Sequence, residues 1–99
     1  MPVVKGPARI IAQPEGRVLG GGMCYLAVQP GRLGGTLSRL VWVDPEQELS
    51  DQGEYRLQFM LDGRWLPIRF LRVGETGCGP VIARFEGLAP LKEEAEGTP

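Results

Sequence analysis

Arginine is the residue type in this chain with the clearest capacity for ligand chemistry. The 99 residues contain eleven basic side chains, of which nine are Arg and two are Lys. A planar guanidinium can hold a phosphate through two parallel hydrogen bonds, which a lysine ammonium cannot do. Four arginines in the glycine-rich N-terminal half form the candidate ligand set: Arg9, Arg17, Arg32 and Arg39.

The stretch QPGRLGGTLSRLVWVD, residues 29–44, combines two of these arginines with several glycines. Glycine lets a backbone approach a phosphate closely, so Gly34 and Gly35 are candidate backbone donors beside Arg32 and Arg39 as clamps. The stretch matches neither a P-loop nor the G-x-G-x-x-G pattern. We interpret it first as a connector between strands that carries surface charges, and second as one wall of an anion site.

Enzyme chemistry has little support in the residue types. The chain has no His, which removes the commonest general base and metal ligand. The acids between Asp44 and Glu54 lack the spacing of a calcium-binding loop. Cys24 lies in an apolar run and is expected in the core, whereas Cys78 lies between two glycines and is expected in a loop. We therefore predict a protein that is not an enzyme, with no metal and no cofactor.

Composition and charge predict one ordinary globular domain. The net charge is −1, so the chain lacks the overall positive field of a non-specific nucleic-acid binder. No apolar run approaches the roughly 20 residues of a membrane span, and the first eleven residues do not resemble a secretory signal. We expect a single cytoplasmic domain over residues 1–99, with flexible ends at 1–7 and 92–99.

Short apolar runs separated by Gly and Pro predict an all-β fold. The 15 Gly and 9 Pro make 24 residues of this kind, with no long helical period between them. Because closure removes free strand edges, we predict a small six-stranded antiparallel barrel with a short C-terminal helical turn. The six expected strands are Ala8–Gln13, Met23–Val28, Thr36–Val43, Glu54–Leu61, Arg64–Val73 and Pro80–Leu88, with a turn at Gly20–Gly22 and a helical turn at Pro90–Gly97.

The strongest local pattern is a hairpin around Asp62-Gly63, the residue pair typical of a type I′ turn. A two-residue loop pairs Phe59 with Leu66. The same register pairs Leu57 with Ile68 and Tyr55 with Phe70. Partners across a ladder share a face, so one face is uniformly apolar. That face consists of Tyr55, Leu57, Phe59, Leu66, Ile68 and Phe70.

The opposite face of this hairpin carries three apolar exceptions: Met60, Trp65 and Leu71. Packing over the end of a barrel is the simpler interpretation of Trp65. The other interpretations are stacking on a nucleic-acid base and a contact surface for a partner, because exposed aromatic and apolar side chains mark interaction sites.

Three motifs carry a resemblance to a known family: GRLGGTLSRLVWV, DQGEYRLQFMLDGRWLPIRFLRV and GPVIARFEGLAP. Through them, residues 31–88 resemble a PilZ domain, in which they match the strand after the binding loop, the central pair and the closing strand, in that order. The resemblance implies a six-stranded barrel that binds cyclic di-GMP or acts as a protein adaptor. Pro30 and Arg32 stand where the family has the acid and the serine of its D-x-S-x-x-G element, and the preceding R-x-x-x-R element is missing. The chain therefore resembles a divergent member.

GRWLPIRFLRV and ARFEGL are also similar to the N-terminal barrel of the ribosome maturation factor RimM. Three hypotheses follow. The first is a non-enzymatic binding or adaptor barrel whose partner is another protein or a cyclic dinucleotide. The second is a barrel that contacts RNA or the ribosome. The third is a structural subunit that assembles, with itself or others, through Trp65, Met60 and Leu71.

Overall fold

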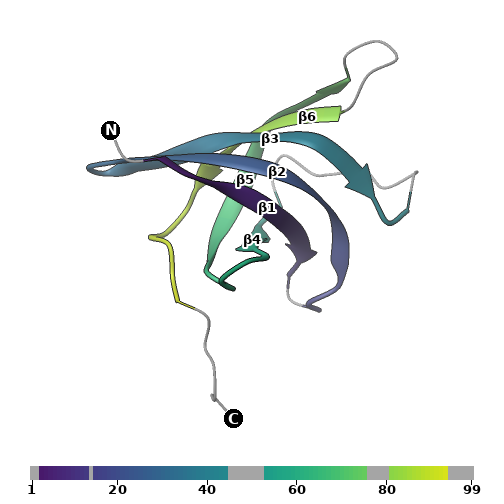
Figure 1. The fold of residues 1–99 in the computed structure, drawn as a ribbon, viewed down its shortest axis with the longest axis horizontal. Helices are drawn as coiled ribbons and strands as arrows, with labels where there is room; N and C mark the ends of the chain where they lie inside the picture. Colours follow the sequence, from purple (N-terminus) through teal and green to yellow (C-terminus); the bar gives the residue numbers. More distant parts are fainter. Residues whose placement is uncertain (1–2, 14, 45–52, 76–80, 94–99) are drawn as a thin grey trace.

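Six antiparallel strands close into a barrel in the order β1-β2-β3-β6-β5-β4 (Figure 1). The computed structural model describes residues 3–13, 15–44, 53–75 and 81–93. Within these ranges the predicted all-β, six-stranded barrel is confirmed. The strands are β1 (Val3–Ala12), β2 (Val18–Gln29), β3 (Arg32–Trp42), β4 (Tyr55–Phe59), β5 (Trp65–Glu75) and β6 (Val81–Gly87).

The inside of the barrel is a packed apolar core. Alternate residues of each strand point inward, because successive side chains of a strand lie on opposite faces. No polar or charged residue is buried among the residues that the structure describes, so the described interior is lined by apolar side chains. The largest fully buried side chains are Phe85, Ile10, Leu26, Leu37, Leu57, Leu66 and Ile68.

The Gly20–Gly22 run lies inside β2, so the predicted turn there is wrong. A Cβ atom on Gly20 would lie 2.6 Å from the carbonyl oxygen of Val41, and one on Gly22 would lie 2.5 Å from that of Ser38. These glycines therefore let β2 pass close to β3. The close approach depends on a neighbouring strand, which local sequence patterns do not specify.

The β4–β5 hairpin forms at the predicted place with a different register. Leu57 pairs with Leu66 and Tyr55 with Ile68, two residues away from the predicted partners. The loop is longer than two residues: the Phe59 N–H donates to the Arg64 carbonyl, and the Gly63 N–H donates to the Phe59 carbonyl. Only Gly63 of the Asp62-Gly63 pair has a positive φ, of 78°, whereas a type I′ turn needs two such residues.

A shift of two residues keeps every side chain on its face, because the side-chain period of a strand is two. The predicted apolar face is thus correct. Leu57, Leu66 and Ile68 are fully buried, and Tyr55 packs against the edge of the core with its ring centroid 5.4 Å from that of Phe70.

Both chain ends differ from expectation within the described range. β1 begins at Val3, inside the stretch expected to be flexible, and Val3 pairs with Ala27. At the other end, residues 88–93 contain no helical turn. Lys92 instead forms a β-bridge with Trp65, because the start of β5 offers it a free backbone N–H and C=O. The rest of the predicted helical turn, from residue 94, lies outside the described residues.

Candidate functional site

A hollow of about 450 Å³ lies on the outer surface of the barrel, over β2, β3, β6 and β5. Gly34 of β3 forms its floor, because it pairs with Ala27 on one side and Glu86 on the other and contributes no side chain. The side chains around it are those of alternate, outward-facing positions. They include Arg32, Thr36, Leu71, Arg84 and Glu86.

Two exposed arginines stand at the walls of this hollow, which we call the Gly34 hollow. Neither Arg32 nor Arg84 makes an ion pair with any residue in the described ranges. Glu86 is already neutralised, because its Oε1 accepts a hydrogen bond from Nη2 of Arg69. The hollow therefore combines two free cations with an apolar contact from Leu71 and a hydroxyl from Thr36.

Arg72 adds a further positive charge beside the hollow. It is the direct cross-strand partner of Arg84, and both side chains are exposed. Like charges at directly opposed positions repel each other. A bound anion between them would remove that repulsion.

The structure brings only part of the predicted ligand set together. Arg32, Gly34 and Gly35 line the Gly34 hollow. Both glycines are strand residues of β3 and not loop residues, because the connector after β2 consists of Pro30 and Gly31 alone. Gly35 faces the inside, where a Cβ atom would lie 1.9 Å from the Tyr25 carbonyl oxygen. The close packing of β3 against β2 therefore explains why this position is a glycine, and a ligand is not needed to explain it.

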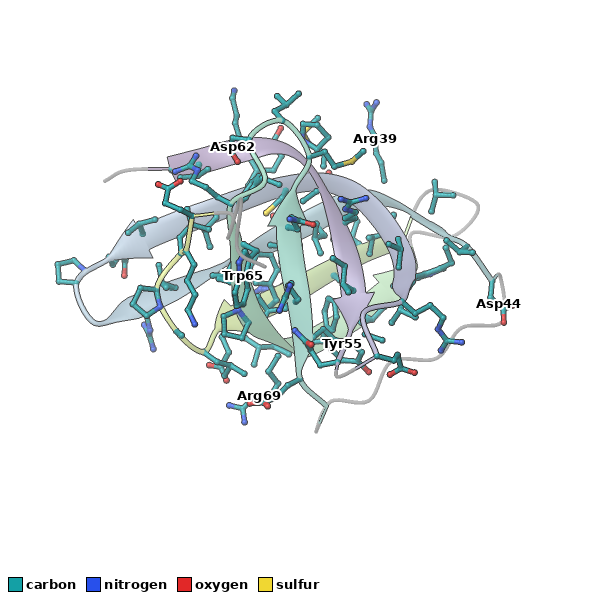
Figure 2. All side chains as sticks on the ribbon, turned by 90° about the horizontal axis from the view of Figure 1, so that it is seen from below. Arg39, Asp44, Tyr55, Asp62, Trp65 and Arg69 are labelled. Carbon is teal, nitrogen blue, oxygen red and sulfur yellow. The ribbon has the colours of Figure 1, made fainter. Side chains whose placement is uncertain are left out.

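The other three predicted arginines lie elsewhere. Arg39 is seven residues beyond Arg32 on β3, about 20 Å along the strand. Its side chain and that of Arg69 point away from opposite sides of the barrel (Figure 2). Arg17 is exposed in the β1–β2 connection. Arg9 lies on β1, and its Nε donates to Oε1 of Gln58 over 3.3 Å.

Arg84 and Glu86 are site residues that the sequence prediction missed. Their outward orientation was predictable, since Ala83 and Phe85 alternate with them and are buried. What the pattern could not show is that β6 pairs with β3, which places Glu86 opposite Gly34 and Arg84 opposite Thr36. Strand order over this sequence distance is a tertiary property.

The predicted partner residues do not form one patch. Trp65 is half-buried, with the guanidinium carbon of Arg56 3.9 Å and the Lys92 ammonium 4.8 Å from the centroids of its ring system. Met60 lies in the β4–β5 loop and is 59% exposed. Leu71 lies six residues beyond Trp65 on β5, about 20 Å along the strand, where it joins the Gly34 hollow.

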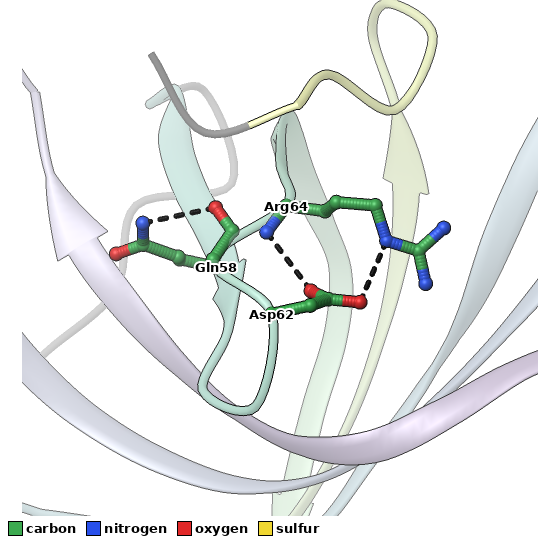
Figure 3. Close-up of polar contacts among 4 residues, drawn as sticks. Gln58, Asp62 and Arg64 are labelled. Carbon is green, nitrogen blue, oxygen red and sulfur yellow. Dashed lines mark hydrogen bonds and ion pairs between the residues drawn. The ribbon is translucent and has the colours of Figure 1, made fainter. Parts of the chain in front are cut away.

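The loop of the β4–β5 hairpin holds one arginine in place (Figure 3). Oδ1 of Asp62 accepts a hydrogen bond from the Arg64 backbone N–H at 3.0 Å, and Oδ2 accepts one from Nε of Arg64 at 2.7 Å. These bonds favour the ionised carboxylate and lower the pKa of Asp62. Nε2 of Gln58 donates to the Gly63 carbonyl at 3.1 Å and closes the loop from the other side.

Cys24 is fully buried in the core, as predicted. Burial disfavours the charged thiolate and raises the pKa of Cys24 to about 12, so this thiol is a packing residue. Cys78 lies outside the described residues. Within the described ranges, no group of three or more His, Cys, Asp or Glu residues is placed to hold a metal ion, and no helix is long and apolar enough to cross a membrane.

Comparison with known proteins leaves the geometry as the only guide to function. No protein-family model matches the chain, and neither the curated proteins nor the solved structures contain a match.

Proposed function

We propose that this protein is a non-enzymatic binding module that holds a phosphate-bearing ligand of the nucleotide or cyclic dinucleotide class in the Gly34 hollow. The observation that carries the proposal is the pair of exposed arginines, Arg32 and Arg84, on either side of a floor without a side chain. Neither has an ion-pair partner among the described residues. The volume of about 450 Å³ lies in the range of small-molecule sites.

The chemistry of the walls suits a cyclic dinucleotide. Arginine binds phosphate oxygens through two donors, Thr36 offers a hydroxyl for a base or sugar, and Leu71 offers an apolar contact for a ring. Cyclic di-GMP is also the ligand that the PilZ resemblance suggests, so it is the first ligand to test. A binding module of this kind passes its signal to another protein, in keeping with the adaptor role.

Isothermal titration calorimetry with cyclic di-GMP tests the proposal. Arg84→Gln removes one charge-assisted contact and is expected to weaken binding about tenfold. Gly34→Ala raises the floor, and its Cβ would lie 3.3 Å from the Phe85 carbonyl oxygen, close enough to need only a small adjustment. We expect a loss of about tenfold here also.

Two matched variants serve as controls. Gly74→Ala is a glycine substitution in β5 whose Cβ meets no atom within 4 Å, and Arg17→Gln removes an exposed charge far from the hollow. Both should bind like the unmodified protein. Equal weakening by Arg17→Gln and Arg84→Gln, or no heat of binding at millimolar ligand, would reject the proposal.

One observation favours a second candidate, contact with single-stranded RNA. Tyr25 of β2 is 45% exposed and pairs with Thr36, which pairs in turn with Arg84. An exposed aromatic ring in one row with arginines is suited to base stacking next to phosphate contacts. RNA binding would fall steeply with salt and would be lost in Tyr25→Ala, whereas cyclic di-GMP binding should survive that substitution.

The third candidate, assembly through Trp65, Met60 and Leu71, has less support, because these residues are spread over about 20 Å of β5 and its preceding loop. Light scattering at high protein concentration separates it from the other two. A monomer that binds cyclic di-GMP excludes it.

A further inference from the structure

A second hollow, of about 680 Å³, lies at one end of the barrel between the β2–β3 hairpin and residues 87–91. Its walls are mainly apolar. Four of the side chains that line it also pack against the core: Val4, Val28, Leu33 and Leu91. We call it the mouth. Mouths of small barrels are among the places where small apolar ligands bind.

The outer wall of the mouth is attached to the barrel at both of its ends. The Leu88 N–H donates to the Pro67 carbonyl at 2.9 Å, and Lys92 exchanges two backbone hydrogen bonds with Trp65 at 2.7 and 2.9 Å. Between these points, Leu91 packs against the core. The hollow is therefore formed before any ligand arrives.

Two arginines border this apolar space. Arg32 makes no ion pair with any residue in the described part of the chain. Arg64 is paired through its Nε with Oδ2 of Asp62 at 2.7 Å, so its charge is positioned and partly neutralised, and among the described residues Arg32 carries the unpaired charge of the border. Glu86, the acid among the described residues that line the mouth, is paired with Arg69.

An apolar space with a positively charged border fits a ligand that has an apolar chain and one negative end. We propose that the mouth is a second binding site, for an amphipathic carboxylate of the medium-chain fatty-acid class. The chain would lie against Val28, Leu33 and Leu91, and the carboxylate would lie between Arg32 and Arg64. Burial of the chain supplies affinity, and the arginines select the sign of the charge.

The mouth adjoins the Gly34 hollow, and the two share four lining residues: Gln29, Arg32, Leu33 and Glu86. Arg84 lines the Gly34 hollow alone, and Arg64 lines the mouth alone. Each site can thus be impaired without the other. Arg32→Gln is expected to weaken both ligands, Arg64→Gln only the fatty acid, and Arg84→Gln only the phosphate ligand.

Decanoate, below its micelle concentration, is the probe. We expect binding by calorimetry, with amide shifts in NMR spectra confined to Val28, Leu33 and residues 87–91. Decyltrimethylammonium has a tail of closely similar length and the opposite charge, and it should bind about tenfold more weakly. Arg64→Gln should weaken decanoate binding about threefold to fivefold.

Leu88 provides a matched pair of variants, because it lines the mouth and is 38% exposed, so that a polar side chain there is tolerated. Leu88→Asp and Leu88→Lys remove the same apolar contact and differ in charge. Decanoate should bind about tenfold more tightly to the lysine variant than to the aspartate variant. Equal binding of the two probes, equal binding by the two variants, or shifts spread over the whole barrel would overturn the proposal.

Discussion

Arg72 of β5 and Arg84 of β6 face each other directly across the ladder, with both side chains on the outer surface. A β-bulge between Phe70 and Arg72 sets this register. The pair concentrates positive charge beside the Gly34 hollow at some expense of stability, because opposed like charges destabilise a sheet.

Replacement of one member of this pair should raise stability and lower ligand affinity together. Arg72→Glu turns repulsion into attraction, so we expect the free energy of unfolding to rise by about 0.5 kcal/mol and the melting temperature by about 2–4 °C. Cyclic di-GMP affinity should fall. Calorimetry and thermal denaturation measure both effects, and Arg17→Glu, with the same change in net charge, should produce neither. A lower melting temperature in Arg72→Glu would contradict this account.

Gly35 should be the most sensitive of the glycines in the 29–44 stretch. Because a Cβ atom there would meet the Tyr25 carbonyl oxygen at 1.9 Å, Gly35→Ala forces β2 and β3 apart. We expect a loss of about 3 kcal/mol or more in denaturant-induced unfolding, or no folded protein at all. Gly74→Ala, which meets open space, should stay within about 0.5 kcal/mol of the unmodified protein.

The bridge between Lys92 and Trp65 should stabilise the fold through its backbone hydrogen bonds more than through the Lys92 side chain. Lys92→Pro removes the N–H that donates to the Trp65 carbonyl, and we expect a loss of about 1–2 kcal/mol in the free energy of unfolding. Lys92→Ala keeps that bond and removes only the ammonium near the ring, at an expected loss of about 0.5 kcal/mol. Equal losses in the two variants would show that the backbone bridge is not formed.

Asp62 should make stability depend on pH in the acid range. Its pKa is lowered in the folded protein, so its stabilising contribution is present above the ordinary value of 3.8 and is lost as the pH falls through the lower folded pKa. Asp62→Asn should therefore melt at a lower temperature than the unmodified protein at pH 7, and the difference should disappear in strong acid. Glu15→Gln, at an exposed acid in the β1–β2 connection, is the control, and a difference that persists unchanged into strong acid would argue against the Asp62–Arg64 interaction.

Cys24 should be unreactive while the barrel is folded. In a Cys78→Ser background, a thiol reagent at pH 8 should label Cys24 only at the rate at which the barrel opens, because the thiol is buried and its pKa is about 12. Added denaturant should restore fast labelling. Fast labelling of the native protein would show that the core around β2 is open to solvent.

The sequence by itself determined the all-β class, the inward and outward faces of the strands, and the buried position of Cys24. These properties follow from the alternation of apolar and polar residues along each strand. The predicted faces of the β4–β5 hairpin are correct although its register is wrong by two residues, because two residues are one side-chain period. The arginine excess likewise made Arg32 a candidate ligand residue, and Arg32 lines the Gly34 hollow.

Tertiary structure alone decided which outward residues meet. The pairing of β6 with β3 places Arg84 and Glu86 beside Gly34, and the length of β3 separates Arg32 from Arg39. The glycines of β2 and β3 are required by the approach of a neighbouring strand and not by a turn. Local patterns report the face of a residue, whereas neighbours across a barrel depend on closure of the whole chain, which no short segment encodes.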